Sequence, residues 1–244
     1  MAERVKPRRS YHSPRRQQQA AATRQAILEA ALRLFEQRGY PATTMEQVAA
    51  EAGVALKTVY VAFQTKSGLL RALWDLRLKG DQEQAAVAER PWYREVVDEP
   101  DPERQLQRNA RNARVVKQRI AGVLRVLRSA APVDPDAAAL WRLIQSDFYD
   151  NQRVIVETLH ANKALRPGLD VAPATDILWT LNHPDVWLLL VGERGWTPEQ
   201  WERWFADTAC AQLLRPPRPN DDEADDEAEA KAPTAAEPQG VEHR

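Results

Sequence analysis

The residues with the clearest chemical potential lie on one short predicted helix, residues 55–63. At about 100° per residue, three of its apolar residues, Val59, Ala62 and Phe63, fall on one side and can pack on a core. The opposite side carries an ammonium, a phenol, a hydroxyl and two aliphatic groups, on Lys57, Tyr60, Thr58, Leu56 and Val61. Lysine reaches phosphates and guanine edges, hydroxyls bond to phosphate oxygens, and aliphatic groups touch thymine methyls. This face therefore suits the major groove of double-stranded DNA.

A preceding short helix, residues 45–52, is expected to position this face. Gly53 can adopt positive φ in the tight turn between the two helices. Thr43 or Thr44 would cap the first of them, each in a capping box with the residue three positions later. These threonines, and Lys66 at the next helix start, are candidates to hold backbone phosphates. An ordinary helical hairpin with a polar outer face would show the same two-helix pattern.

The wider stretch from Thr23 to Leu70 resembles the DNA-binding domain of the tetracycline-repressor (TetR) family. The matching pieces occur in order at the expected spacing: Ile-Leu-Glu-Ala-Ala at 27–31, Leu34-Phe35, Arg38-Gly39-Tyr40, Thr43-Thr44, Val48-Ala49, Ala52-Gly53-Val54, Thr58-Val59-Tyr60, Phe63, Lys66 and Leu69-Leu70. Residues 165–170, 176–179 and 194–197 resemble the C-terminal part of one branch of the family. Together these pieces are far more specific than the two-helix pattern by itself.

The resemblance implies a homodimer with a three-helix DNA-binding head and a larger helical body. It implies a transcriptional regulator, normally a repressor, that binds a palindromic operator and responds to a small-molecule effector. The DNA contacts implied by position are Thr43, Thr44, Leu56, Lys57, Thr58, Tyr60, Val61 and Lys66. The alternative is a DNA-binding dimer that is regulated by a protein partner, or by no ligand.

The sequence departs from the usual family pattern at three points. Ala55 stands where a serine often caps the recognition helix, so a side-chain cap is expected to be missing. Val61 and Ala62 replace aromatic or histidine residues, and Gln64-Thr65 replaces a proline-serine type pair. These changes leave the fold intact and alter the operator sequence that the helix would read.

Amino-acid composition and the positions of helix-starting and helix-ending residues predict four segments. Residues 1–18 are expected to be a disordered basic arm, in which Arg15 or Arg16 could enter a minor groove. Residues 19–80 are expected to form the DNA-binding domain and residues 81–215 the regulatory and dimerisation domain. Residues 216–244 are expected to be a disordered acidic tail. The two charged ends cancel, so the net charge of −1 conceals the asymmetry.

The fold class is predicted to be all-α, because helical periodicity recurs and no strand pattern competes. A first helix starts near Thr23 and ends at Gly39. Aspartate or threonine before a proline marks three later helix starts and predicts helices over 102–130, 135–162 and 198–214. A further helix is predicted over 173–191, interrupted at Pro184.

Aromatic and polar side chains make the body a candidate effector site. The candidate ligand-binding residues are Trp74, Trp141, Asp147, Tyr149, Gln152, Trp179, Asn182 and His183. Packing in a core or an interface explains any single tryptophan as well, and a kinked helix with an exposed histidine explains the segment 182–184. A stripe of Trp201, Trp204, Phe205 and Thr208 is a candidate dimer interface, together with Trp179, Val186, Leu189 and Leu190.

An enzyme, a metal site and a cofactor are not expected. The four histidines do not form pairs with metal-ligand helix spacing, and no glycine-rich phosphate loop or Gly-x-Ser-x-Gly motif is present. Cys210, the single cysteine, indicates a reducing cytoplasm and behaves as a small apolar residue. No apolar run approaches the roughly 20 residues that span a membrane.

Overall fold

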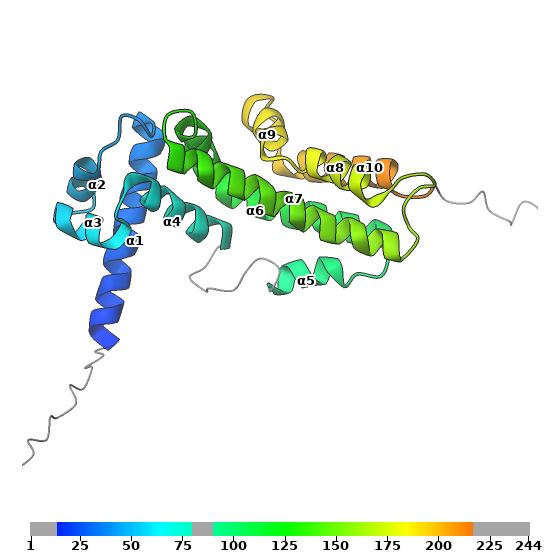
Figure 1. Cartoon of the computed structure of the whole chain (residues 1–244), viewed down its shortest axis with the longest axis horizontal. Helices are drawn as coiled ribbons and strands as arrows, with labels where there is room; N and C mark the ends of the chain where they lie inside the picture. Colours follow the sequence, from blue (N-terminus) through cyan, green and yellow to red (C-terminus); the bar gives the residue numbers. More distant parts are fainter. Residues whose placement is uncertain (1–13, 80–89, 217–244) are drawn as a thin grey trace, which may run out of the picture.

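The computed structural model describes residues 14–79 and 90–216, and all elements in these ranges are helical (Figure 1). In chain order they are α1 (Pro14–Arg38), α2 (Met45–Glu51), α3 (Leu56–Phe63), α4 (Lys66–Lys79), α5 (Pro91–Val97), α6 (Pro102–Ala130), α7 (Pro135–Ala161), α8 (Val171–Leu181), α9 (Pro184–Trp187), a π-helical turn (Leu188–Glu193) and α10 (Pro198–Leu213). The predicted all-α class is confirmed.

Helices α1–α4 form the head of the molecule, and α5–α10 form the body. In the head, α2 and α3 lie against α1 at the end farthest from α8 and α10 (Figure 1). Ile27, Phe35, Val59 and Leu70 are among the fully or almost fully buried side chains that join these helices. Burying them stabilises the head by roughly 1.5–3 kcal/mol per large side chain.

Helix α1 begins at Pro14, which is nine residues before the predicted start at Thr23. Its first turns carry Arg, Gln and Ala residues that favour helix although they are exposed. The prediction of disorder up to residue 18 is therefore wrong for residues 14–18, because high helix propensity needs no apolar stripe. Residues 1–13 of the predicted arm lie outside the described residues, as do residues 217–244 of the predicted acidic tail.

The body is built on the long antiparallel pair α6 and α7, with α5 on one side and α8 and α10 on the other (Figure 1). The predicted starts of α6, α7 and α10 are confirmed. The capping oxygens of Asp101, Asp134 and Thr197 accept from backbone N–H groups in the first turn of each helix. Helix α5 has no counterpart among the predicted helices, since seven residues show too little periodicity.

Two hydrophobic cores divide the molecule between them. The first joins the head to the part of α6 from Val116 to Ala130 and the part of α7 from Ala137 to Ile144. The second joins the other half of α6 and α7 to α8, α10 and the π-helical turn. The boundary between the cores thus runs across the middle of α6 and α7, and not between head and body.

The break at Pro184 is confirmed. Helix α8 ends at Leu181 with Asn182 as its C-cap, and His183 caps α9 by accepting from the Asp185 N–H. Within the described part of the chain, no helix combines the length and apolarity that crossing a bilayer requires.

Candidate DNA-binding surface and ligand cavity

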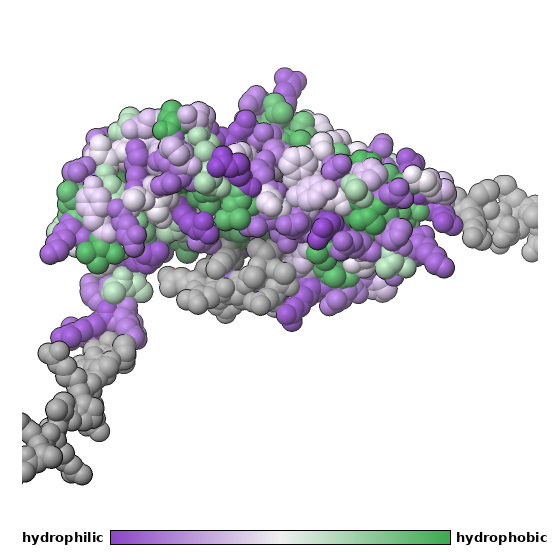
Figure 2. All heavy atoms as spheres, viewed as in Figure 1, coloured by the Kyte–Doolittle hydropathy of each residue, from purple (hydrophilic) through white to green (hydrophobic). Residues whose placement is uncertain are grey.

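Helix α3 presents the predicted mixed face to solvent. Lys57, Thr58, Tyr60 and Val61 are exposed, and the Val61 side chain is 75% exposed. Leu56 is half-buried at the edge of this face. In the space-filling view, hydrophilic and hydrophobic atoms alternate over the end of the molecule formed by α2 and α3 (Figure 2). A cation, hydroxyls and aliphatic groups therefore share one convex helix surface.

The inner face of α3 fixes its orientation on the head. Val59 is fully buried and Phe63 is 5% exposed. The Arg24 guanidinium of α1 lies 4.3 Å from the centre of the Phe63 ring and donates to the Ala62 carbonyl at 3.0 Å. Gly53 has φ of +66°, which allows the turn from α2. These contacts hold the exposed face rigidly outward.

The cap chemistry of α2 and α3 differs. Thr44 and Gln47 form the reciprocal capping box on α2, which confirms one of the two predicted pairings. Ala55 precedes α3 without a side-chain cap, as the sequence predicts. The first N–H groups of α3 are thus left for solvent or another acceptor.

Two predicted phosphate contacts are directed inward. Thr43 is fully buried, and its hydroxyl lies 2.9 Å from the Gly39 carbonyl and 3.3 Å from the Leu34 carbonyl. Its side chain therefore holds the α1–α2 loop and does not face DNA, which corrects the prediction for Thr43. The half-buried Lys66 ammonium donates to the carbonyls of Tyr40 at 3.0 Å and Thr43 at 3.1 Å, so it also ties that loop to α4.

The joint between α3 and α4 is tight. Gln64 has φ of +62°, an uncommon conformation for a residue with a side chain. In the first turn of α4, a Cβ added to Gly68 would lie 2.3 Å from the Phe63 carbonyl oxygen. Glycine at 68 is therefore required for α4 to pass beneath the end of α3.

Two side-chain hydrogen bonds join the head to the N-terminal end of α7. The Tyr40 hydroxyl donates to the Asp134 carboxylate at 2.6 Å, and the Ser67 hydroxyl donates to Asp136 at 3.1 Å. Burial and the adjacent Asp134 carboxylate raise the pKa of Tyr40 well above its usual value. Desolvation opposes ionisation of Asp134, but hydrogen bonds from Tyr40 and from the Ala137 and Asp136 amides lower its pKa.

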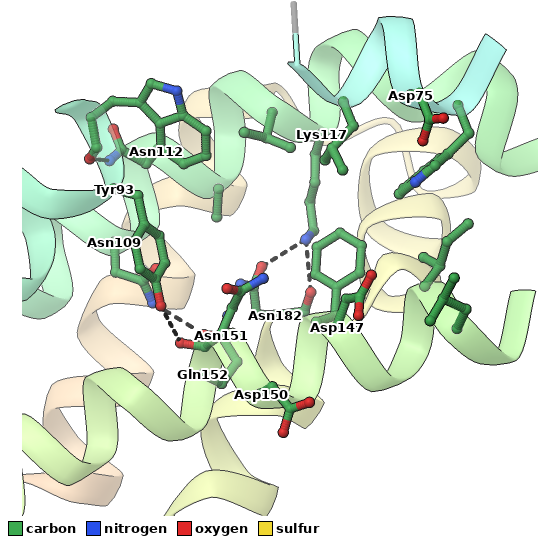
Figure 3. A pocket seen from close by; sticks show the side chains of 18 of the residues that line it. Asp75, Tyr93, Asn109, Asn112, Lys117, Asp147, Asp150, Asn151, Gln152 and Asn182 are labelled. Carbon is green, nitrogen blue, oxygen red and sulfur yellow. Dashed lines mark hydrogen bonds between the residues drawn. The ribbon is translucent and has the colours of Figure 1, made fainter. Parts of the chain in front are cut away.

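A cavity of about 410 Å³ opens between α4, α5, α6 and α7 (Figure 3). Four predicted ligand-binding residues line it: Trp74, Asp147, Gln152 and Asn182. The other four predicted residues, Trp141, Tyr149, Trp179 and His183, are not among its lining residues. Its size lies within the range of small-molecule sites.

The Trp179 ring lies in a separate aromatic cluster beside the α8–α9 break. Its centroid is 4.8 Å from the His183 ring and 6.2 Å from the Tyr149 ring. Burial lowers the pKa of His183, partly against the Asp185 carboxylate. The prediction of a kinked helix is met, but His183 is half-buried rather than exposed.

The most polar part of the cavity wall escaped the sequence analysis. Fully buried Lys117 donates to both oxygens of Asn182, at 2.7 Å to the carbonyl and 2.6 Å to Oδ1 (Figure 3). Asn109 donates to Gln152 at 3.3 Å nearby. A signal was present: Leu106, Ala110, Ala113, Lys117, Ile120 and Leu124 are spaced alternately by four and three residues, so a lysine stands within an apolar stripe.

The predicted dimer stripe on α10 is wrong for its two largest inner residues. Trp201 and Phe205 are fully buried within the chain itself, where Trp201 packs on Trp187 at 5.0 Å between ring centroids. Trp204 and Thr208 remain half-buried, with Trp204 beside Trp196. Apolar spacing alone does not separate a helix's own core face from an interface face.

No group of three His, Cys, Asp or Glu side chains close enough to hold a metal ion lies within residues 14–79 and 90–216. Burial, together with nearby Glu103, Asp207 and Asp101, raises the pKa of half-buried Cys210 to about 11. Cys210 is therefore a protonated thiol at neutral pH, with little nucleophilic character.

Comparison with known proteins matches residues 27–73 to the family described as bacterial regulatory proteins, tetR family. The chain is 44% identical over 59 residues to the transcriptional regulator AcrR of Shigella flexneri, covering 24% of this chain and 27% of that protein. It is 42% identical over 55 residues to the regulator TtgW of Pseudomonas putida, covering 22% of this chain and 41% of that protein. Each match thus spans less than half of the relative.

Solved structures extend the likeness to the body. NalD, the secondary repressor of the MexAB-OprM multidrug efflux pump in Pseudomonas aeruginosa, superposes with a TM-score of 0.61 at 24% identity, covering 81% of this chain and 99% of that chain. The SmeT–triclosan complex gives a TM-score of 0.61 at 18% identity, covering 90% and 100%. A protein from Saccharomonospora viridis in complex with choline gives 0.60 at 18% identity, covering 80% and 99%.

The body thus shares its fold with these proteins, while the head shares its sequence pattern with curated regulators. Residues 27–73, which hold most of the head and its helix-turn-helix, match the tetR family of bacterial regulatory proteins, and the whole described chain resembles solved structures of that fold.

Proposed function

We propose that this chain is a transcriptional repressor that binds a palindromic DNA operator as a homodimer and leaves it when a small molecule fills the cavity. The exposed face of α3 carries the proposal, because it places Lys57, Thr58, Tyr60 and Val61 on one rigid surface. Thr44 lies at the N-terminus of α2, where backbone amides favour phosphates. Arg15 and Arg16, exposed on the first turn of α1, add positive charge.

A homodimer would place two α3 helices in successive major grooves, with half-sites about 34–36 Å apart or a multiple of that spacing. The half-buried side chains at the edge of the second core on α8 and α10, including Ile177 and Trp204, are the candidate contact. Sedimentation equilibrium tests this. A species of twice the chain mass supports it, and a monomer at micromolar concentration contradicts it.

The cavity supports ligand control, and two proteins of the same fold were solved with small molecules, triclosan and choline. A dimer regulated by a protein partner is the second candidate. Thermal shift against a metabolite panel separates the two, because a ligand that binds the folded state alone raises the melting temperature.

The deciding experiment is a gel shift with the DNA upstream of the chain's own coding region, at two salt concentrations. We expect Lys57→Ala and Tyr60→Ala each to weaken binding, by about tenfold or more. Arg153→Ala removes an exposed cation from α7 and is the matched control, with unchanged binding expected. Weak binding that is erased by salt and indifferent to all three changes would contradict the assignment of α3 as the recognition helix.

A further inference from the structure

We propose that the cavity selects an organic acid: a flat apolar body bearing one anionic group that pairs with Lys117. This inference rests on the proposed ligand control and names the chemical class of the effector. The apolar wall of the cavity would contact the flat body of the acid, and the Lys117 ammonium would pair with its anionic group.

Lys117 is an unusual component of a helical core. Its side chain is fully buried, and no carboxylate of the described residues lies within 4.0 Å of its ammonium. The rings of Phe148 and Trp201 lie 5.4 and 5.3 Å from Nζ, which compensates the charge only in part. A buried charge without a counter-ion is costly, so an anion brought by a ligand would be strongly favoured here.

The geometry leaves room for that anion. Asn182 accepts two of the three ammonium hydrogens, at its carbonyl and at Oδ1, and Lys117 itself lines the cavity. Figure 3 shows the Lys117 ammonium held by Asn182 at the cavity wall. A carboxylate there would accept the third hydrogen in a charge-assisted bond. Trp74, Trp92 and Ile144 offer apolar surface for the rest of the molecule.

Other charged groups on the cavity lining face a different environment. Arg71, Asp75, Asp147 and Asp150 are exposed, so water screens them. Asp150 points away from Lys117 in Figure 3. Burial and the Asp150 carboxylate raise the pKa of Asp147, against the effect of Arg71. These rim carboxylates would favour a cation at the opening, which makes an organic amine the competing ligand class.

Proton uptake gives a second signature of the same pairing. Burial lowers the pKa of Lys117 to about 7, so a large fraction of the amine is neutral at pH 8 in the free protein. A further titratable group, His183, is close enough for the Lys117 charge to lower its pKa, and Asp185 and Arg128 are its other charged neighbours. An anion at Nζ stabilises the ammonium, so acid binding at pH 8 should draw a proton from the buffer.

The test uses three probes with one skeleton: 1-naphthylacetate, 1-naphthylacetamide and 2-(1-naphthyl)ethylamine. Isothermal titration calorimetry of the full chain at pH 8, in buffers of different ionisation enthalpy, measures affinity and proton uptake. We expect the acid to bind about tenfold or more tightly than the amide and the amine, with net uptake of part of one proton. Equal affinities, a preference for the amine, or no acid binding at millimolar concentration would overturn the proposal.

Variants assign the effect to one residue. Lys117→Met keeps the length of the side chain and should abolish both the acid preference and the proton uptake. Arg71→Met, which removes another cation from the lining, should leave both intact, and the reverse pattern would overturn the assignment. A gel shift of wild type and Lys117→Met without probes decides the proposed DNA binding separately, so failure of one proposal is distinguishable from failure of the other.

Discussion

The head and the middle of the body bury very different side chains. In the head, the buried residues are apolar except for Thr43, whose hydroxyl closes a loop. In the body, Gln105, Asn109, Lys117, Gln152 and Asn182 are all buried, and most of them line the cavity. A well-packed apolar core favours a single conformation. Buried polar groups that line a cavity are costly, and a ligand that pairs with them lowers that cost. This difference supports the proposal that the head binds DNA as a rigid unit and that the body responds to a ligand.

The largest expected effect tests the rigidity of the head. In Gly68→Ala, the new Cβ would meet the Phe63 carbonyl oxygen at 2.3 Å, so α4 or α3 must shift. We expect a loss of about 3 kcal/mol in the free energy of unfolding, with loss of DNA binding. Chemical denaturation measures it. Gly192→Ala, where no atom lies within 4 Å, is the control and should change stability by less than about 0.5 kcal/mol.

The next prediction concerns the buried charge of Lys117, and here the substitution is expected to increase the free energy of unfolding. Lys117→Met should raise the free energy of unfolding by about 1–2 kcal/mol at pH 6, because it removes an uncompensated buried charge. The pKa of Lys117 falls from 10.5 to about 7 on folding, so wild type should gain stability as pH rises from 7 towards 10.5.

The advantage of Lys117→Met should accordingly shrink across that pH range, by at most about 1.4 kcal/mol per pH unit. Urea denaturation at pH 6, 8 and 9.5 measures the trend. A variant less stable than wild type at every pH would show that the bonds to Asn182 outweigh the cost of burying the charge.

A smaller effect tests the junction between the two regions. Tyr40→Phe removes the hydrogen bond to Asp134 and should cost about 1.5 kcal/mol. Since that bond lowers the pKa of Asp134, wild type should lose its advantage as pH falls below the ordinary aspartate value of 3.8.

Tyr93→Phe is the matched change inside the body, where the hydroxyl donates to the uncharged Asn151 carbonyl at 3.0 Å. It should cost less than Tyr40→Phe, about 0.5–1 kcal/mol. Thermal unfolding of both variants at pH 7 and at pH 3 gives the comparison. An equal cost at both positions would contradict the view that the junction bond is charge-assisted.

The smallest effect compares two caps of the same design. Thr44 caps α2 in the head and Thr197 caps α10 in the body, each in a capping box with a glutamine. Each change to alanine should cost about 1 kcal/mol. Only Thr44→Ala should also weaken operator binding in the gel shift, since Thr197 caps a helix of the body and not of the head. Equal DNA affinity in the two variants would argue against a phosphate contact near Thr44.

Local signals in the sequence accounted for most helix boundaries. Asp101, Asp134 and Thr197 each precede a proline, and this chemistry marks a helix start without any tertiary information. Helix α5 was missed because its burial depends on residues distant in the sequence. The inward turn of Thr43 was missed for a different reason: either Thr43 or Thr44 fits the capping pattern, and the carbonyls of Leu34 and Gly39 that hold the Thr43 hydroxyl carry no side-chain signal.

The cavity was only partly predictable. Asp147 and Gln152 lie five residues apart on one predicted helix, so the sequence assigned both to one element, although at about 100° per residue they do not share a face. Lys117 and Asn182 are 65 residues apart and meet only because α6 passes the end of α8. Polarity at an apolar position indicates that something unusual occurs at Lys117, but its partner follows from topology alone.

The boundary between the two hydrophobic cores has a consequence for cooperativity. Since the first core includes the head together with the proximal halves of α6 and α7, each long helix should belong to two separate unfolding units. Amide hydrogen exchange along α6 would then change its protection near Ala113–Val116, within one continuous helix. A molecule bound at that boundary would contact both unfolding units. It would thereby change the angle between the unit that contains the head and the unit that contains α8 and α10.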